Sequence, residues 1–171
     1  MSVIVGIDVG ATTIAGGLVT DRGEILSAVR RGTASGGAGR AVETLLDITD
    51  ELVAQAGRRG LRLDGVGIGL PGLVNFEKGM MVDESNFVPE FVHVPLAESV
   101  GARTGLPAFI DNDVNVLALG EWTFGAARGV ASVVVIALGT GIGGGIILDD
   151  RLVRGHVGSA GEFGHVPFDP A

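Results

Sequence analysis

A short stretch near the N-terminus places a carboxylate and two hydroxyls beside a glycine, an arrangement that can hold phosphate. In "GIDVGATT" (residues 6–13), Asp8 lies near the end of an apolar run and is followed by Gly10 and two threonines. Backbone N–H groups and hydroxyls in such a turn can bind phosphate oxygens, and the carboxylate can hold Mg²⁺ through water. Taken alone, the stretch fits equally well an ordinary turn in which the aspartate bonds to its own backbone.

A second glycine-rich stretch, "ALGTGIGGG" (residues 137–145), has five glycines and a threonine directly after an apolar run. Glycine leaves the backbone amides unobstructed, which suits a polyphosphate. The stretch is not a Walker A loop, because it lacks the GK[ST] ending. Gly139, Gly141 and Gly144 have the G-x-G-x-x-G spacing, but a further apolar strand is expected after them instead of a helix, which argues against a dinucleotide-binding loop.

Acidic and amide side chains gather in "FIDNDVNVLALGEW" (residues 109–122), where Asp111, Asn112, Asp113 and Asn115 follow an apolar run. A carboxylate at a strand end, beside a helix N-terminus, can accept a hydroxyl proton. Asp and Asn are also common N-caps, so we expect one of the two acids to cap the helix and the other to be available for chemistry.

Two further stretches combine glycine with groups that can contact a polar ligand. Gly72 closes "GLPG", which is either a plain turn or a turn that brings backbone against a ligand. Near the C-terminus, "GSAGEFGHVPFDPA" holds Glu162 and His165 within a glycine-rich run. No second cluster of polar ligands follows them, so they look like half of a site.

The elements that must position these residues begin with an apolar strand over Val3–Val9. The turn residues Asp21-Arg22-Gly23 predict a hairpin, followed by a third strand. Apolar residues at helical spacing predict a helix over Ala41–Ala56, which Gly57 or Gly60 would end. A short strand is then expected to run into the "GLPG" turn.

The rest of the chain is expected to continue with strands and helices in alternation. Residues 75–95 lack periodicity and predict a long loop, and Pro95 is expected to begin a short helix through Ala102. "PAFIDND" predicts a strand, residues 114–124 a helix, and "VASVVVIALGTGIGGGIILDD" a strand, a glycine turn and a strand. This order indicates an α/β fold.

Two parts of the sequence repeat one design. "VIVGIDVGATT" and "VVVIALGTGIGGG" are each an apolar strand that opens into a glycine turn with threonine, followed by another strand. The repetition suggests a duplicated fold with a cleft between two halves. Each of these stretches, taken alone, would also fit a simple β-hairpin.

Composition limits the classes of function. The chain has 171 residues, a net charge of −8 and no basic stripe, which argues against nucleic-acid and membrane-surface partners. It has no cysteine and therefore no disulfide or thiolate metal site. No apolar run of membrane-spanning length and no signal peptide are recognisable, so a soluble, cytoplasmic protein is expected.

Five of these stretches, "DVGATT", "GIGLPGLV", "DNDVNVLALGE", "ALGTGIGGG" and "GSAGEFGH", occur in the order and spacing of one known family. Over nearly its whole length, the chain resembles the ROK family of bacterial sugar kinases and sugar-responsive repressors. The resemblance implies the actin/hexokinase-like ATPase fold, of the ribonuclease H-like kind, with two α/β lobes around a nucleotide and sugar cleft. It implies an N-terminal lobe at residues 1–112 and the start of an incomplete second lobe at residues 113–171.

The resemblance also implies a role for each matching residue. Asp113 would be the general base, and Asp8 would hold magnesium through water. The residues implied to bind sugar are Gly72, Asn112, Asp113, Glu162 and His165. The residues implied to bind the nucleotide phosphates are Asp8, Gly10, Thr12, Thr13, Gly139, Thr140, Gly141 and Gly143. His165 would in addition ligate a structural Zn²⁺.

The chain departs from the family pattern in two ways. Members often have lysine after the phosphate-loop threonine, where this chain has Thr13, so one cation near the phosphates is missing. The family also continues into a cysteine-rich zinc motif and the rest of the second lobe, with another sugar-binding glutamate. We therefore expect a fragment, inactive by itself, whose zinc site exists only with the downstream cysteines; a natural short protein is the alternative. The protein as a whole is expected to form a homodimer or higher homo-oligomer.

Two functions follow from the resemblance. The first is ATP-dependent phosphorylation of a hexose by a glucokinase-like enzyme that uses ATP and Mg²⁺. The second is the sugar-binding domain of a transcriptional repressor. Repressors of this family carry a helix-turn-helix domain ahead of the first phosphate loop. With a first strand expected at Ser2 or Val3, no such domain is expected within these residues, an expectation that does not hold if the sequence is a piece of a longer protein. Asp113 and the two phosphate loops also favour the kinase.

Overall fold

The computed structural model describes residues 1–34, 39–83, 87–139 and 141–167, and the chain divides into two compact units, Met1–Asp113 and Val114–Ala171. Thr140, one of the predicted phosphate-binding residues, lies outside the described residues. The predicted lobes, 1–112 and 113–171, concern the domains of the whole protein and stay a prediction. None of the helices in the described ranges has both the length and the apolar character needed to cross a membrane.

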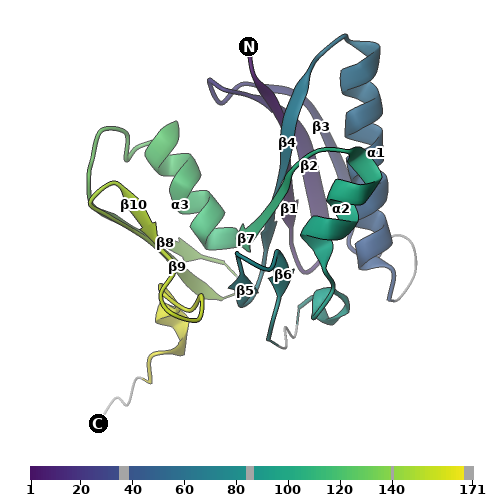
Figure 1. The fold of residues 1–171 in the computed structure, drawn as a ribbon. Helices are drawn as coiled ribbons and strands as arrows, with labels where there is room; N and C mark the ends of the chain where they lie inside the picture. Colours follow the sequence, from purple (N-terminus) through teal and green to yellow (C-terminus); the bar gives the residue numbers. More distant parts are fainter. Residues whose placement is uncertain (35–38, 84–86, 140, 168–171) are drawn as a thin grey trace. The chain divides into compact units, whose positions relative to one another are not determined.

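The first unit is built on a five-stranded sheet with the order β3-β2-β1-β4-β7 (Figure 1). β1 pairs antiparallel with β2, and β2 pairs antiparallel with β3. β4 lies parallel to both β1 and β7. The five strands are β1 (Val3–Val9), β2 (Thr13–Thr20), β3 (Ile25–Gly32), β4 (Leu63–Leu70) and β7 (Ala108–Asn112). The strand over Val3–Val9 and the hairpin around Asp21–Gly23 are confirmed.

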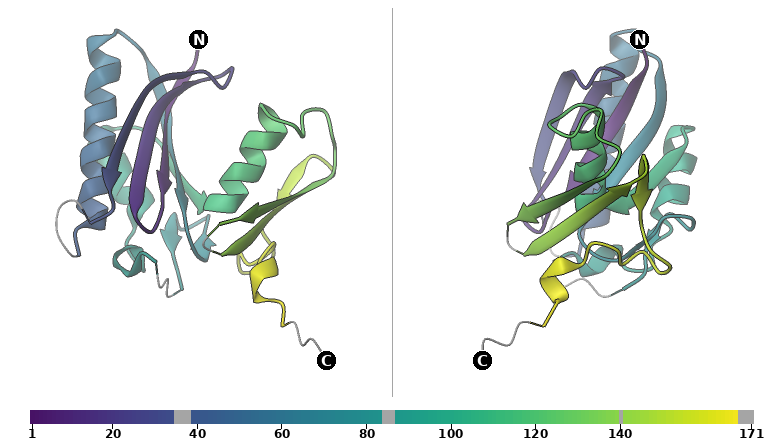
Figure 2. Two further views of the ribbon diagram at one scale, coloured as in Figure 1. Left: turned by 180° about the vertical axis from the view of Figure 1, so that it is seen from behind. Right: turned by 90° about the vertical axis from the view of Figure 1, so that its left-hand side faces the viewer.

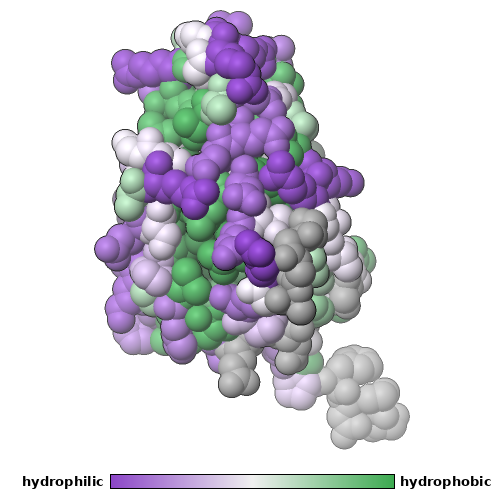
Figure 3. All heavy atoms as spheres, turned by 90° about the vertical axis from the view of Figure 1, so that its right-hand side faces the viewer, coloured by the Kyte–Doolittle hydropathy of each residue, from purple (hydrophilic) through white to green (hydrophobic). Residues whose placement is uncertain are grey.

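Two helices, α1 (Ala41–Arg58) and α2 (Leu96–Thr104), lie on one face of this sheet (Figures 1 and 2). The alternation of β1 explains why: Val3, Val5, Ile7 and Val9 are buried, whereas the residues between them point to the other face. Seen from the side of α1 and α2, the surface carries hydrophilic and hydrophobic side chains together (Figure 3). The core of the unit therefore lies between the sheet and the two helices.

The two helices predicted for this unit are present, and each ends two residues after the last residue of its predicted range. α1 continues to Arg58, so Gly57 lies inside the helix and the chain leaves it before Gly60, whose φ is 63°. α2 ends at Thr104 instead of Ala102, because Gly105 supplies the left-handed conformation (φ 70°) that closes the helix.

The prediction of one long loop over residues 75–95 is wrong in part. β5 (Val74–Asn75) pairs with β6 (Met80–Met81), and a 3₁₀ helix η1 spans Pro89–Phe91. Met81 and Phe91 are fully buried in the core of the unit and fix this segment. Strands of two residues are too short to show any periodicity, which is why the pattern missed them.

The second unit combines a helix with a three-stranded sheet in the order β10-β9-β8. α3 (Asp113–Thr123) begins at the last residue of the first unit, one residue before the predicted start. β8 (Val133–Leu138) and β9 (Ile142–Leu148) form an antiparallel hairpin, as the strand–glycine–strand pattern predicted. β10 (Arg151–Val153), which the sequence did not reveal, pairs with β9, and a 3₁₀ helix η2 spans Phe163–His165.

One glycine of the first sheet is required by packing. A Cβ atom added at Gly16 in β2 would lie 2.7 Å from Ile48 Cγ2 and 2.9 Å from Leu52 Cδ1, both on α1. The absence of a side chain lets α1 approach the sheet closely, so that Ile48 and Leu52 are fully buried.

We predict that Gly16→Val lowers the free energy of unfolding by about 1–3 kcal/mol, because the added methyl groups overpack the contact with α1. Urea denaturation measures the change. The matched control is Gly67→Val in β4, where a Cβ atom would meet nothing within 4 Å. An equal loss of stability in the two variants would contradict this account of Gly16.

Candidate functional site

The three parallel strands of the first unit end at the same edge of the sheet. Asp8 of β1 pairs with Gly69 of β4, and Gly69 pairs with Asp111 of β7, so these three residues form one row. In sheets of this kind ligands bind outside the carboxyl ends of the parallel strands. The predicted site residues of this unit lie in this row or shortly after it along the chain. They are 8–13 at the end of β1, 72 after β4, and 112–113 at the end of β7.

The turn after β1 is fixed by hydrogen bonds of its own backbone. The N–H of Gly10 donates to the carbonyl of Thr13 at 2.8 Å. Thr33, which follows β3, donates its hydroxyl to the carbonyl of Gly10 at 2.7 Å and its N–H to the carbonyl of Thr12 at 3.0 Å. The Gly10 amide is thus engaged inside the turn, and its role toward phosphate would be to shape the turn, with the exposed Thr12 presented to solvent.

Asp8 lies on the face of the sheet opposite the helices and is reached by solvent. Loss of hydration raises the pKa of the Asp8 carboxyl above its ordinary value of 3.8, and the positive charge of Arg30 opposes this rise. An accessible carboxylate beside the turn of residues 10–13 fits magnesium held through water, because Mg²⁺ keeps several of its water ligands in proteins.

Two of the predicted sugar-binding residues lie together. The side-chain amide of Asn112 donates to the carbonyl of Gly72 at 3.2 Å, which joins the end of β7 to the turn after β4. Gly72 has a φ of 129°, a conformation that residues with side chains rarely adopt. The N–H of Asn112 donates to the buried carboxylate of Asp111 at 2.8 Å. Asp113, the next residue, is half-buried and begins α3.

The glycines of the second stretch divide into two groups. Gly139 donates its N–H to the carbonyl of Gly141 at 2.9 Å, and a Cβ atom at either residue would meet nothing within 4 Å. Gly143, by contrast, lies within β9, and a Cβ atom there would lie 2.6 Å from Val114 Cγ2 on α3. Its lack of a side chain is therefore already needed for packing in the second unit, and its phosphate-binding role stays a prediction.

The neighbours of Gly143 are packed in the same way. A Cβ atom at Gly145 would lie 2.5 Å from the Ala118 side chain on α3, and one at Gly144 would overlap the ring of Phe163. Successive residues of a strand point to opposite faces, so α3 covers one face of β9 and η2 the other.

Glu162 and His165 flank the 3₁₀ helix η2. Gly161 and Gly164 hold this segment against β9, because a Cβ atom at either one would overlap the backbone of Gly144 or Ile142. The Nε2 atom of His165 lies 3.7 Å from the Oε2 atom of Glu162, and the His165 side chain is 84% exposed. The two predicted sugar ligands are thus adjacent on the surface of the second unit.

The residues present do not make up the implied zinc site. Among the residues that the structure describes, no three His, Cys, Asp or Glu side chains lie close enough to share a metal ion. The sequence contains no cysteine. Within the part of the chain that the structure describes, His165 therefore has no set of zinc ligands.

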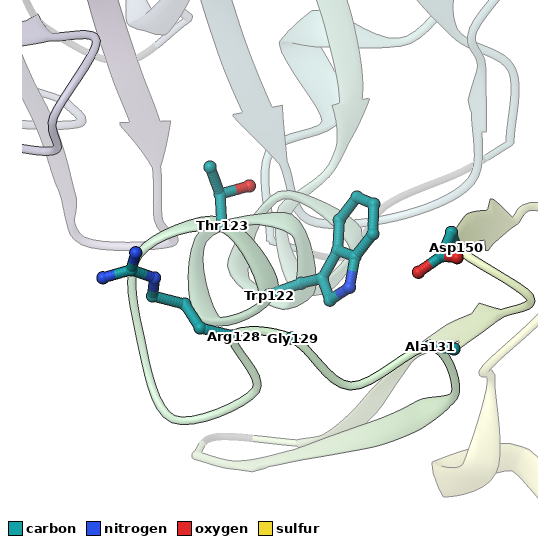
Figure 4. Close-up of a pocket in the computed structure, with 6 residues that line it drawn as sticks. All are labelled: Trp122, Thr123, Arg128, Gly129, Ala131 and Asp150. Atoms are coloured by element: carbon teal, nitrogen blue, oxygen red, sulfur yellow. The ribbon is translucent and has the colours of Figure 1, made fainter.

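A shallow, open depression on the second unit is lined by none of the predicted site residues (Figure 4). The indole N–H of Trp122 donates to the carbonyl of Val130 at 2.9 Å and fixes one side of it. The other lining residues are Thr123, Arg128, Gly129, Ala131 and Asp150.

Sequence reasoning missed Thr33, which bonds to the predicted phosphate turn, and Arg30, whose charge acts on Asp8. A signal existed for Thr33, since a threonine at the end of a strand next to a glycine turn can donate to the backbone of that turn. Arg30 could be placed only after the register of β3 on β2 was known.

The comparison with protein families matches the ROK family over residues 4–171 of the chain. The chain belongs to the ROK family. This ROK protein is 40% identical to a glucokinase of Streptomyces coelicolor over 170 residues, which are 99% of the chain and 51% of that enzyme. It is 38% identical to a glucokinase of Thermotoga maritima and 32% identical to a xylose repressor of Bacillus subtilis, of which it covers 51% and 42%. The chain spans about half the length of the curated relatives it matches.

Solved structures of the ROK family share the fold. A ROK family glucokinase from Streptomyces griseus, in complex with glucose and AMPPNP, matches 98% of this chain with a TM-score of 0.83 and 37% identity; the match covers 51% of that enzyme. A ROK family transcriptional regulator, a homologue of E. coli Mlc, matches 99% of the chain with a TM-score of 0.84 and 28% identity. The fold is therefore the N-terminal part of the actin-like ATPase fold of these proteins, as predicted. Glucokinases and repressors are both homologues.

We predict that Asp8→Asn raises the stability of the protein at neutral pH. The pKa of Asp8 is raised in the folded state, so the charged carboxylate is disfavoured there, and stability falls as pH rises from 3.8 through the folded pKa. Asparagine removes this penalty. Urea midpoints at neutral pH and below pH 3.8 measure the effect, which should vanish at the lower pH. A variant less stable than the wild type at neutral pH would contradict the prediction.

Proposed function

We propose that the protein is an ATP-dependent hexose kinase of the glucokinase kind. The observation that carries the proposal is the Asn112–Asp113 pair at the carboxyl end of β7, with the Asn112 amide held by the carbonyl of Gly72. The glucokinase of Streptomyces coelicolor, 40% identical over 99% of the chain, supports it.

In this proposal Asp113 is the general base. Its carboxylate accepts the proton of the primary hydroxyl of the sugar while that oxygen attacks the γ-phosphorus of ATP in line. The bond from the γ-phosphorus to the β,γ-bridging oxygen breaks, and ADP leaves with the electron pair. Asp113 is half-buried and directly follows β7, which supports a fixed position for its carboxylate.

Other polar groups orient the sugar. The hydrogen bond from Asn112 to Gly72 sets the orientation of the Asn112 amide, so that it can serve as a directional partner for a sugar hydroxyl. In the second unit, Glu162 and His165 supply a carboxylate and an imidazole within one short segment for further hydroxyls.

The phosphates of ATP are assigned to the two glycine turns. Thr12 and Thr13 supply hydroxyls in the first turn, and the open backbone at Gly139 and Gly141 supplies room for close approach in the second. Asp8 holds Mg²⁺ through water, and this ion, when bound, offsets the negative charge of the transferred phosphoryl group.

A sugar-responsive repressor is the second candidate function. A putative xylose repressor of a Caldicellulosiruptor species and a xylose repressor of Bacillus subtilis are 35% and 32% identical to the chain over 99% and 96% of its length, so homology alone does not separate the two functions. Asp113 and the two phosphate turns favour the kinase.

We predict that the full-length protein releases ADP in the presence of at least one hexose, and that Asp113→Asn lowers kcat by about 10²–10⁴-fold, because asparagine cannot accept the proton. A coupled ADP assay over a hexose panel measures this, with Asp21→Asn in the β2–β3 turn as control. Sugar affinity, measured by calorimetry, should fall much less than kcat in Asp113→Asn, because asparagine can still hydrogen-bond the sugar hydroxyl. Sugar binding without ADP release, together with specific DNA binding, would establish the repressor instead.

We predict that Gly72→Ala lowers both stability and sugar affinity, because alanine strains a backbone with a φ of 129° and shifts the carbonyl that holds Asn112. The strain should lower the free energy of unfolding by about 1–3 kcal/mol. Gly105→Ala is the control: at a φ of 70° it imposes a smaller backbone strain at the end of α2, away from Asn112. Equal sugar affinities in the two variants would contradict the role of Gly72.

A further inference from the structure

Two neighbouring arginines in β3 point to opposite faces of the sheet. Arg31 pairs with Ile14, a core residue, and its Nη2 atom lies 2.6 Å from the Glu51 Oε2 atom on α1. Arg30 pairs with Ala15, which in turn pairs with Asp8. Directly paired residues of antiparallel strands share a face, so Arg30 lies on the Asp8 face of the sheet, away from the helices.

Arg30 is also close to the first glycine turn. Three residues farther along, Thr33 bonds to the carbonyls of Gly10 and Thr12, and three residues of a strand span about 10 Å. The backbones of Arg30 and Asp8 are two strands apart, again about 10 Å. A long arginine side chain covers much of either distance, and the charges of Arg30 and Asp8 do interact.

Several other arginines of this unit have partners away from the turn. These pairs are Arg31 with Glu51, Arg40 with Glu43, Arg59 with the carbonyl of Leu26, Arg62 with Asp64, and Arg103 with Asp50. Arg30, by contrast, is exposed and shares a row with Asp8.

The register of β2 on β3 also bears on the lysine that many family members have where this chain has Thr13. Thr13 pairs with Gly32, and its side chain lies on the same face as Ala15 and Arg30, because residues two apart on a strand share a face. A lysine at position 13 would therefore direct its charge to the face to which Arg30 directs its own.

We propose that Arg30 binds phosphate oxygens of the nucleotide held at the turn of residues 10–13, and so supplies from β3 the cation that position 13 lacks. Its planar guanidinium can donate two parallel hydrogen bonds to a phosphate group. This inference rests on the proposed function, because it requires a nucleotide at that turn.

The test compares nucleotide affinities of full-length variants by calorimetry at fixed, moderate salt. Arg30→Gln should weaken ATP binding by about 10–100-fold, the range expected for a lost hydrogen bond to a charged group. Adenosine affinity should stay unchanged, whereas the thermal midpoint at neutral pH should fall slightly, because Arg30 no longer offsets the charge of Asp8. Arg62→Gln removes the same charge from a side chain that is 90% exposed, and should leave ATP affinity within about threefold. The double variant Arg30→Gln with Thr13→Lys should recover most of the loss.

Each outcome decides the proposal. Unchanged ATP affinity in Arg30→Gln overturns it, and so does an equal loss of ATP and adenosine affinity, which would indicate a structural role. A wild-type protein that binds ATP but phosphorylates no hexose removes the proposed function. The proposal for Arg30 is then still decided by the ratio of the ATP affinities of the wild type and Arg30→Gln. A wild-type protein that binds no ATP overturns both. If Arg30→Gln does not fold, Arg30→Lys, which keeps the charge, must retain ATP binding for the proposal to survive.

Discussion

The candidate site of the first unit depends on the parallel pairing of β4 with both β1 and β7. Parallel strands run in one direction, so their carboxyl ends come to one edge of the sheet, although the three segments are far apart in sequence. The register then places Asp8, Gly69 and Asp111 in one row. A shift of one residue in either pairing would turn the row's side chains into the helix-covered core, where an unpaired carboxylate is strongly disfavoured. The buried residues of β1 therefore fix the position of its polar ones.

Glycine serves two distinct purposes in this chain, and composition alone does not separate them. Gly16, Gly143 and Gly145 lie in strands where a helix approaches so closely that a side chain would overlap it. Gly139 and Gly141 lie where added atoms would meet nothing. Packing explains the first group without any ligand. Open space at the second group has no such explanation, and exposed backbone is what close approach of a phosphate would require.

The sequence predicted the elements well where the hydrophobic period was long. The strand of residues 3–9 and the helix that begins at Ala41 were recovered because each buries one face over several repeats. Helix ends were less certain: Gly57 and Gly60 are both stop signals in the sequence, and in the structure it is Gly60, with a φ of 63°, that follows the end of α1. β5, β6 and β10 have two or three residues each, which is less than the pattern needs.

The sequence predicted which residues belong to the candidate site, but it did not predict how their side chains are arranged. Asn112 and Gly72 were both named from the sequence, but the hydrogen bond between them depends on the pairing of β7 with β4. Thr33 and Arg30 went unnoticed: the signal for Thr33 is a single threonine at a strand end, and Arg30 stands in no recognisable motif. Their relation to the turn of residues 10–13 arises from the β2–β3 register, which depends on the hairpin as a whole.

The two arginines of β3 illustrate how one strand can serve stability and function together. Arg31 pairs with a carboxylate on α1 at 2.6 Å, and this contact links the edge of the sheet to the helix layer. Arg30, one residue earlier, lies on the opposite face with Asp8, whose charged form is disfavoured by loss of hydration. A carboxylate kept in such surroundings lowers stability at neutral pH unless a cation offsets its charge. Arg30 offsets it in part, and a magnesium ion would offset it further, so the electrostatics of this face favour cations and, through them, the phosphates that cations bind.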